Sequence, residues 1–196
     1  MRLNSPFAKN LPLKADTFGI VYGPAAETYI AYPKDKSTHN AILLLTDVIG
    51  HGFINAQLIA DQLAANGYLV VMPDLFHGDP VLLENKPEGF DLMEWLKGHQ
   101  PERVEPVVDA VIKEMRGKMG VKRLGGVGYC FGAKYVVRNL REGRLDVGFV
   151  AHPSFVEADE LKAIKGPLSI AAARKYLPLT PFRGPPSLAR RYRRKY

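Results

Sequence analysis

The sequence has only one cysteine, Cys130, which excludes an intrachain disulfide and a zinc site built from several thiolates. It also lacks any run of eighteen apolar residues, and residues 1–14 mix charged and polar side chains without the apolar core of a signal peptide. These absences favour a soluble protein of a reducing compartment, and we expect a cytoplasmic location and no membrane partner. We expect no metal and no cofactor, and the lone thiol is free for chemistry.

Acidic residues are missing from the C-terminal end. Residues 173–196 hold eight of the 27 Lys and Arg residues and none of the 20 Asp and Glu residues, whereas residues 1–172 hold 19 basic and 20 acidic side chains. We expect residues 173–196 to form a disordered basic tail rich in Pro and Arg. A short charge run is usually solvated, so nucleic acid is not the expected partner, and a tail that binds polyanions is the alternative.

Residues 1–172 predict a single α/β domain. The segments that read as strands are residues 18–22, 28–32, 41–46, 68–72, 124–129, 147–151 and 168–172. The continuous apolar runs at 41–45 and 68–72 suit strands that are covered on both faces, as in a parallel sheet. Alternation of strands with helical patterns favours a doubly wound, mostly parallel sheet, whose ligand crevice lies at the carboxyl ends of the strands.

Two helical patterns lie between these strands. Apolar side chains recur at helical spacing from Val104 to Met115 and should pack on the sheet. A second helix is predicted from about residue 55 to residue 65, where it should bury Leu58, Ile59 and Leu63. Gly67 should end it, because glycine readily adopts the left-handed conformation that follows many helices.

The strongest chemical signal is Gly128-Tyr-Cys-Phe-Gly132, which follows an apolar strand and precedes a helical stretch. This is the spacing of the Gly-x-Ser-x-Gly nucleophile elbow with Cys130 in place of serine. The glycines suit a sharp strand-to-helix turn, and a helix N-terminus after Cys130 stabilises a thiolate. The alternative is that Cys130 is a small buried apolar residue beside glycines that pack a helix.

Four segments in this order, Thr46–His51, Gly67–Asp79, Gly128–Gly132 and His152–Phe155, resemble the dienelactone hydrolase family, especially its fungal branch. The resemblance covers about residues 10–172 and implies the α/β-hydrolase fold with Cys130 as the nucleophile. It also implies an oxyanion hole formed by the backbone N–H groups of Val48 and Phe131.

Four further residues are candidates for a substrate pocket. Asp47 stands where bacterial family members carry a glutamate, and the alternative is a carboxylate that caps a loop. His51 and His77 follow strands that should line the crevice, although solvated loop histidines are the commoner outcome. The resemblance places His152 near the nucleophile, where we expect a structural residue first.

The C-terminal end departs from the family, whose triad runs Cys, Asp, His, with the acid just after the strand that reads 166–173 here. No acidic residue follows Glu160 and no histidine follows His152. The resemblance thus implies a C-terminally incomplete, truncated fold and an impaired hydrolase. A frameshift, a retained intron or an alternative transcript end would give such a tail, which sequencing the transcript across codons 170 to 196 would test.

Two functions follow. The first is a dienelactone hydrolase-like carboxylic-ester or lactone hydrolase with a cysteine nucleophile, whose partner is a small-molecule ester or lactone. The alternative is a non-catalytic ligand-binding or interaction protein, a pseudoenzyme that keeps the pocket without the triad.

Overall fold

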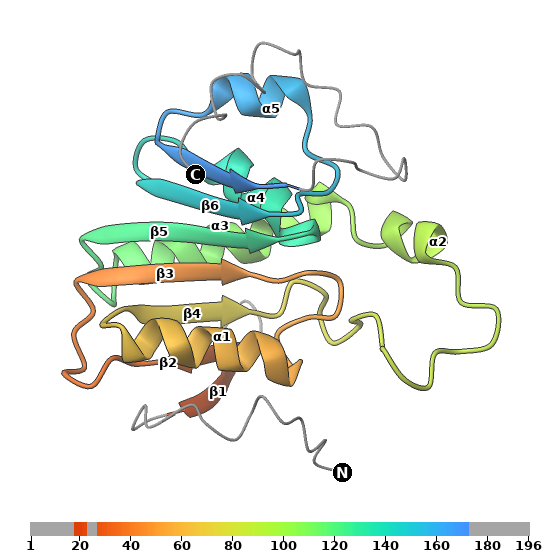
Figure 1. Cartoon of the computed structure of the whole chain (residues 1–196), viewed down its shortest axis with the longest axis horizontal. Coiled ribbons are helices and arrows are strands. Elements are labelled where there is room, and N and C mark those ends of the chain that lie inside the picture. Colours follow the sequence, from red (N-terminus) through yellow and green to blue (C-terminus); the bar gives the residue numbers. More distant parts are fainter. Residues whose placement is uncertain (1–17, 23–26, 173–196) are drawn as a thin grey trace.

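The computed structural model describes residues 18–22 and 27–172 of the chain (Figure 1). Residues 173–196, the predicted basic tail, lie outside this part, so their predicted disorder stays a prediction. The described strands match the predicted ones to within one residue at each end: β1 (Phe18–Tyr22), β2 (Glu27–Ala31), β3 (Asn40–Leu45), β4 (Leu69–Pro73), β5 (Arg123–Tyr129), β6 (Val147–Ala151) and β7 (Leu168–Ala171).

These strands form one sheet in the order β1-β2-β4-β3-β5-β6-β7. The strands from β3 to β7 run parallel, while β2 pairs antiparallel with both β1 and β4. Because β4 and β5 flank β3 on opposite sides, the direction of winding reverses between β3 and β5. In such sheets a crevice forms beyond the carboxyl ends of the strands at the reversal point.

Helices cover both faces of the sheet, as expected when right-handed crossovers run in opposite directions from β3. Figure 1 shows α1 (Ile54–Ala65) in front of the sheet and α3 (Pro101–Arg116) and α4 (Phe131–Asn139) behind it. The short α5 (Ala158–Ala163) packs against α4, and α2 (Leu92–Lys97) lies beyond the carboxyl ends of the strands. None of these helices is long and apolar enough to cross a membrane.

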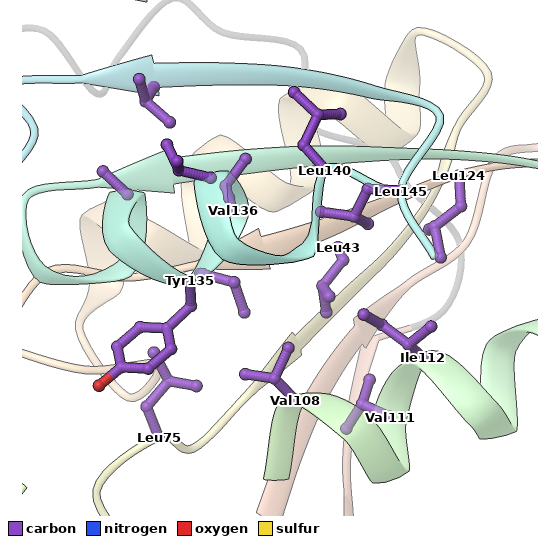
Figure 2. Packing of buried hydrophobic residues seen from close by; sticks show 14 of the residues in the cluster. Leu43, Leu75, Val108, Val111, Ile112, Leu124, Tyr135, Val136, Leu140 and Leu145 are labelled. Atoms are coloured by element: carbon purple, nitrogen blue, oxygen red, sulfur yellow. The ribbon is translucent and has the colours of Figure 1, made fainter. Parts of the chain in front are cut away.

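The core has two layers because successive residues of β3 point to opposite faces. Leu43 and Leu45 join the larger cluster beneath α3 and α4, whereas Ile42 and Leu44 join the smaller cluster beneath α1. Figure 2 shows the side chains of α3 meeting those of α4 and β3 in the larger cluster. All six apolar residues of the predicted stripe on α3 are buried: Val104, Val107, Val108, Val111, Ile112 and Met115.

The predicted face of α1 is confirmed in part, because Ile59 and Leu63 pack against the smaller cluster while Leu58 does not. Leu58, Ile59 and Leu63 are only half-buried, and the fully buried residues are Ala60, Asp61 and Ala64. Two alanines let the helix approach the sheet closely, and the buried Asp61 carboxylate accepts a hydrogen bond of 2.7 Å from the Tyr29 hydroxyl of β2. The predicted end is confirmed, because Gly67 has φ of +93°.

Candidate active site

The turn between β5 and α4 has the geometry of a nucleophile elbow. Cys130 has φ of 50° and ψ of −109°, a conformation that non-glycine residues rarely adopt. Its N–H donates to the Ala151 carbonyl of β6 at 3.1 Å, and the Gly132 N–H donates to the Thr46 carbonyl after β3 at 2.9 Å. Surrounding structure thus holds the strained residue in place. The predicted strand and turn are confirmed, and helix α4 begins at Phe131, directly after Cys130.

The elbow glycines are required by close approach. A Cβ atom on Gly128 would lie 2.7 Å from Cα of Ala133, and one on Gly132 would lie 2.2 Å from the carbonyl oxygen of Leu45. Both contacts involve backbone, which cannot rotate away as a side chain can. Helix α4 therefore begins directly against β5 and the end of β3, and only glycine fits at these two positions.

The thiol of Cys130 contacts a hydroxyl that the sequence did not single out. Sγ of the half-buried Cys130 lies 3.3 Å from Oγ of Ser154, and the Ser154 N–H donates to the Cys130 carbonyl at 3.0 Å. Ser154 belongs to the segment His152–Phe155, which follows the strand next to the elbow strand. That adjacency was the available signal, because neighbouring parallel strands bring the residues after their carboxyl ends together.

The segment that carries Ser154 is firmly held. His152 and Phe155 have φ of 39° and 59°, so two of its four residues adopt conformations that are costly for non-glycine residues. Lys134 of α4 donates to the Phe155 carbonyl at 2.8 Å and also pairs with Glu160 at 2.9 Å. The helix that begins after the thiol therefore also fixes the segment that presents the hydroxyl.

Of the two predicted oxyanion donors, Val48 lies on the loop after β3 and Phe131 is the first residue of α4. In the described turns and loops, neither the Val48 nor the Phe131 N–H donates to a backbone carbonyl. The Val48 carbonyl accepts from the Val81 N–H at 2.8 Å, which fixes the orientation of the loop after β3. The bond between Gly132 and Thr46 brings this loop against the start of α4. The role of these two amides as oxyanion donors stays a prediction.

Asp47 and His152 line one small cavity of about 100 Å³, together with Tyr129. Oδ1 of Asp47 accepts from the Ile49 N–H at 2.9 Å, so the carboxylate does cap its own loop. The exposed imidazole of His152 lies against the Tyr129 ring, with 6.1 Å between the ring centroids. Burial raises the pKa of the Tyr129 phenol, so this hydroxyl stays neutral at physiological pH.

His51 and His77 line neither this cavity nor the larger cleft described below. A solvated His51 was the expected outcome and is wrong, because its side chain is buried between two carboxylates. Its Nδ1 lies 3.8 Å from Asp74, and its Nε2 lies 3.3 Å from Glu27 without the alignment of a hydrogen bond. His77 is exposed, and its Nε2 lies 3.4 Å from the Arg103 carbonyl. The solvated interpretation holds for His77.

The described residues contain no group of three or more histidine, cysteine or acidic side chains that could hold a metal ion. A mostly parallel sheet that is covered on both faces, with a nucleophile elbow at the point where its winding reverses, defines an α/β-hydrolase fold. A model of the dienelactone hydrolase family matches residues 26–175, which is most of the chain. The chain belongs to this family, as the resemblance implied.

Three fungal relatives illustrate the match. Hydrolase pyvD of Aspergillus violaceofuscus is 62% identical over 74% of this chain and 59% of its own length. Hydrolase tropI of Talaromyces stipitatus is 56% identical over 76% of this chain and 61% of its own length. Dienlactone hydrolase 1 of Gibberella moniliformis is 35% identical over 79% of this chain and 62% of its own length. The chain thus spans about 60% of the length of these relatives.

Solved structures agree on the fold. The dienelactone hydrolase-like promiscuous phosphotriesterase P91, from metagenomic libraries, superposes with a TM-score of 0.65 at 14% identity, over 85% of this chain and 72% of that one. The protein m3DLH superposes with a TM-score of 0.64 at 19% identity, over 86% and 72%. At such low identity the agreement concerns the fold alone.

Proposed function

We propose that the chain is a carboxylic-ester or lactone hydrolase in which Cys130 accepts the acyl group. The observation that carries this proposal is the strained elbow, which presents the thiol at the start of α4 and beside a hydroxyl. A buried structural cysteine would not need such a backbone conformation. Membership of a hydrolase family supports the reaction class.

The acylation step follows from the groups around the thiol. The thiolate Sγ attacks the ester carbonyl carbon, the carbonyl oxygen becomes an oxyanion, and the Val48 and Phe131 N–H groups stabilise it. Collapse of this intermediate leaves a thioester on Cys130 and breaks the ester C–O bond. Water accepts the proton when the thiol ionises, and the departing alkoxide takes a proton from water. Ser154 donates to the thiolate and keeps Sγ in place before the attack.

Turnover needs more than acylation, because water must attack the thioester and a base must take its proton. In the relatives' family this base is a histidine that follows the nucleophile and an aspartate, and this sequence has no histidine after His152. We therefore propose that hydrolysis by the 196-residue chain is impaired by several orders of magnitude. The small cavity that His152 shares with Asp47 is where a replacement base would act.

The free thiol supports a reducing, cytoplasmic location, and the substrate class is a small-molecule ester or lactone without a metal or cofactor. The alternative is a ligand-binding pseudoenzyme. One observation favours it: the cleft of about 830 Å³ beside the elbow could bind a ligand even if no reaction takes place. Nucleic acid is not proposed as a partner, because the basic residues in excess lie in residues 173–196.

The test is a burst experiment with para-nitrophenyl acetate. We expect one equivalent of nitrophenolate per chain, an acetyl adduct on Cys130 by mass spectrometry, and slow release afterwards. A Cys130→Ala variant should give no burst, and iodoacetamide should label only the unchanged chain. Robust turnover that disappears in the variant would mean that another base, His152 or His51, acts. Absence of both burst and adduct, with saturable binding of the ester, would favour the pseudoenzyme.

A further inference from the structure

A cleft of about 830 Å³ opens beside the elbow, on the face of the sheet that α4 covers. One wall comes from α2 and the start of α3, including Met93 and Leu96. The other comes from the start of α4 and the segment before α5, including Phe131, Phe155 and Val156. In Figure 1, α2 stands away from the sheet beyond the ends of β5 and β6.

The cleft reaches the elbow through the residues that follow Cys130 and Ser154, although neither of these two residues lines it. Phe131, which lines it, directly follows Cys130 and carries one of the proposed oxyanion amides. Phe155, on the same wall, directly follows Ser154, whose hydroxyl lies 3.3 Å from Sγ. A group bonded to the carbonyl carbon under attack therefore has this cleft next to it.

The floor of the cleft is mostly apolar, with the buried imidazole of His99 as a polar group in the lining. Leu96, Phe131 and Tyr135 contribute to its lining and are at most 7% exposed. The charged side chains of Lys97 and Asp159 are 73% and 89% exposed, so they lie at the rim. An apolar floor with charges of both signs at the rim suits an uncharged, largely apolar ligand.

The one lysine inside the cleft offers no site for an anion. The side chain of Lys134 is 12% exposed, and its ammonium group already pairs with Glu160 at 2.9 Å and donates to the Phe155 carbonyl at 2.8 Å. A carboxylate or phosphate in the cleft would have to displace these partners. The cleft therefore disfavours an acyl group that carries its own negative charge.

We propose that this cleft binds the acyl part of the substrate, and that the preferred esters carry a bulky, uncharged and largely apolar acyl group. The proposal rests on the function proposed above. Pockets for drug-sized ligands measure about 300 to 1,000 Å³, so an acetyl group leaves most of this volume unfilled. Each additional CH₂ that becomes fully buried should increase transition-state binding about fourfold.

The test compares acylation of the full chain by para-nitrophenyl hexanoate and acetate. Each burst rate is divided by the rate of the same ester with N-acetylcysteine, which removes intrinsic reactivity. We expect the hexanoate to be favoured at least about tenfold, because partial burial of four CH₂ groups suffices. Equal normalised rates, or a preference that follows the alcohol part instead, would overturn the proposal.

A matched pair of variants on α2 locates the effect. Met93 lines the cleft and is 61% exposed, whereas its neighbour Leu92 is 43% exposed and does not line it. Both exposed positions accept a larger side chain. Met93→Trp should lower the hexanoate-to-acetate ratio at least about fivefold, and Leu92→Trp should leave it unchanged. The same ratio in both variants would place the acyl group elsewhere.

A binding measurement separates this proposal from the chemistry. Trp95 is the single tryptophan, and its ring stacks on His99 of the cleft wall with 3.9 Å between centroids. In the Cys130→Ala chain, hexanophenone should change the tryptophan fluorescence at concentrations at least tenfold lower than acetophenone does. Tighter binding of hexanophenone without any burst in the unchanged chain would refute only the proposed hydrolase function. A burst without tighter binding of hexanophenone would refute only the proposal that the cleft binds the acyl group.

Discussion

Replacing Gly132 by alanine should dismantle the elbow. The added Cβ would lie 2.2 Å from the carbonyl oxygen of Leu45, 2.4 Å from its carbonyl carbon and 2.6 Å from the carbonyl oxygen of Thr46. Real Cβ atoms essentially never come within 3.0 Å of a heavy atom that belongs to neither their own residue nor its chain neighbours. Relief requires α4 to move away from the end of β3, which stretches the bond of 2.9 Å between the Gly132 N–H and the Thr46 carbonyl.

The expected cost combines two effects. Overpacking in a close-packed interior costs about 1 to 3 kcal/mol when side chains can adjust, and here the opposing atoms are backbone. Weakening a buried hydrogen bond adds about 1 kcal/mol. We therefore expect Gly132→Ala to lower the free energy of unfolding by about 3 kcal/mol or more, which is a large part of the 5 to 15 kcal/mol typical of a domain.

Urea unfolding followed by circular dichroism measures this cost. Gly52→Ala is the matched control, because a Cβ there meets nothing within 4 Å and its φ is not positive. Its unfolding midpoint should stay close to that of the unchanged chain, whereas that of Gly132→Ala should fall clearly at an unchanged slope. Equal midpoints in the two variants would refute the close approach of α4 to β3.

Two further predictions concern the groups around the thiol. Ser154→Val should slow labelling of Cys130 by iodoacetamide about tenfold at neutral pH, whereas Ser154→Thr should retain the rate, because only threonine keeps a hydroxyl that donates to the thiolate. An unchanged or faster rate in the valine variant would mean that the Ser154 hydroxyl instead accepts a hydrogen bond from the thiol. Burial alone would raise the pKa of the Glu160 carboxyl, but hydrogen bonds from the Glu157 N–H, Lys134 and Arg138 outweigh burial and lower it. A carboxyl whose pKa is lowered in the folded state stabilises the protein at neutral pH, and this contribution is lost as pH falls below the ordinary value of 4.5. Glu160→Gln should therefore make the free energy of unfolding, measured with urea, depend less on pH on the acid side. An unaltered pH dependence would contradict this.

Strand positions were predictable because they depend on local pattern. The runs at β3 and β4 are apolar throughout, as strands covered on both faces must be, and the stripe on α3 has one helical period. The elbow was predictable for the same reason, since its glycines and its Cys130 are consecutive in sequence. A close approach between two backbone segments can be recognised in the sequence when only glycine fits at that position.

Features that depend on partners distant in sequence were not predictable. The buried face of α1 includes Asp61 because Tyr29, 32 positions earlier, supplies a hydroxyl. His51 is buried because Glu27 and Asp74 come from two other segments at the same edge of the sheet. Ser154 meets the thiol only through the pairing of β5 with β6. Each of these polar residues reads as a surface residue until its partner is known.

The same contacts separate the presentation of the thiol from the completion of a catalytic cycle. Every described hydrogen bond that holds the elbow joins it to residues between Thr46 and Phe155, which are part of the sheet core. Among the described residues, the Ala171 carbonyl adds to this support, because it accepts from the His152 N–H at 2.8 Å. Neither of the two histidine rings that could act as a base for the hydrolytic water is held in place by these bonds. The His152 ring is exposed against Tyr129, and His51 lies between two carboxylates. Under the proposed function, acylation and turnover depend on different parts of the sequence. A chain that retains the first part should behave as a reagent consumed in one turnover more than as a catalyst.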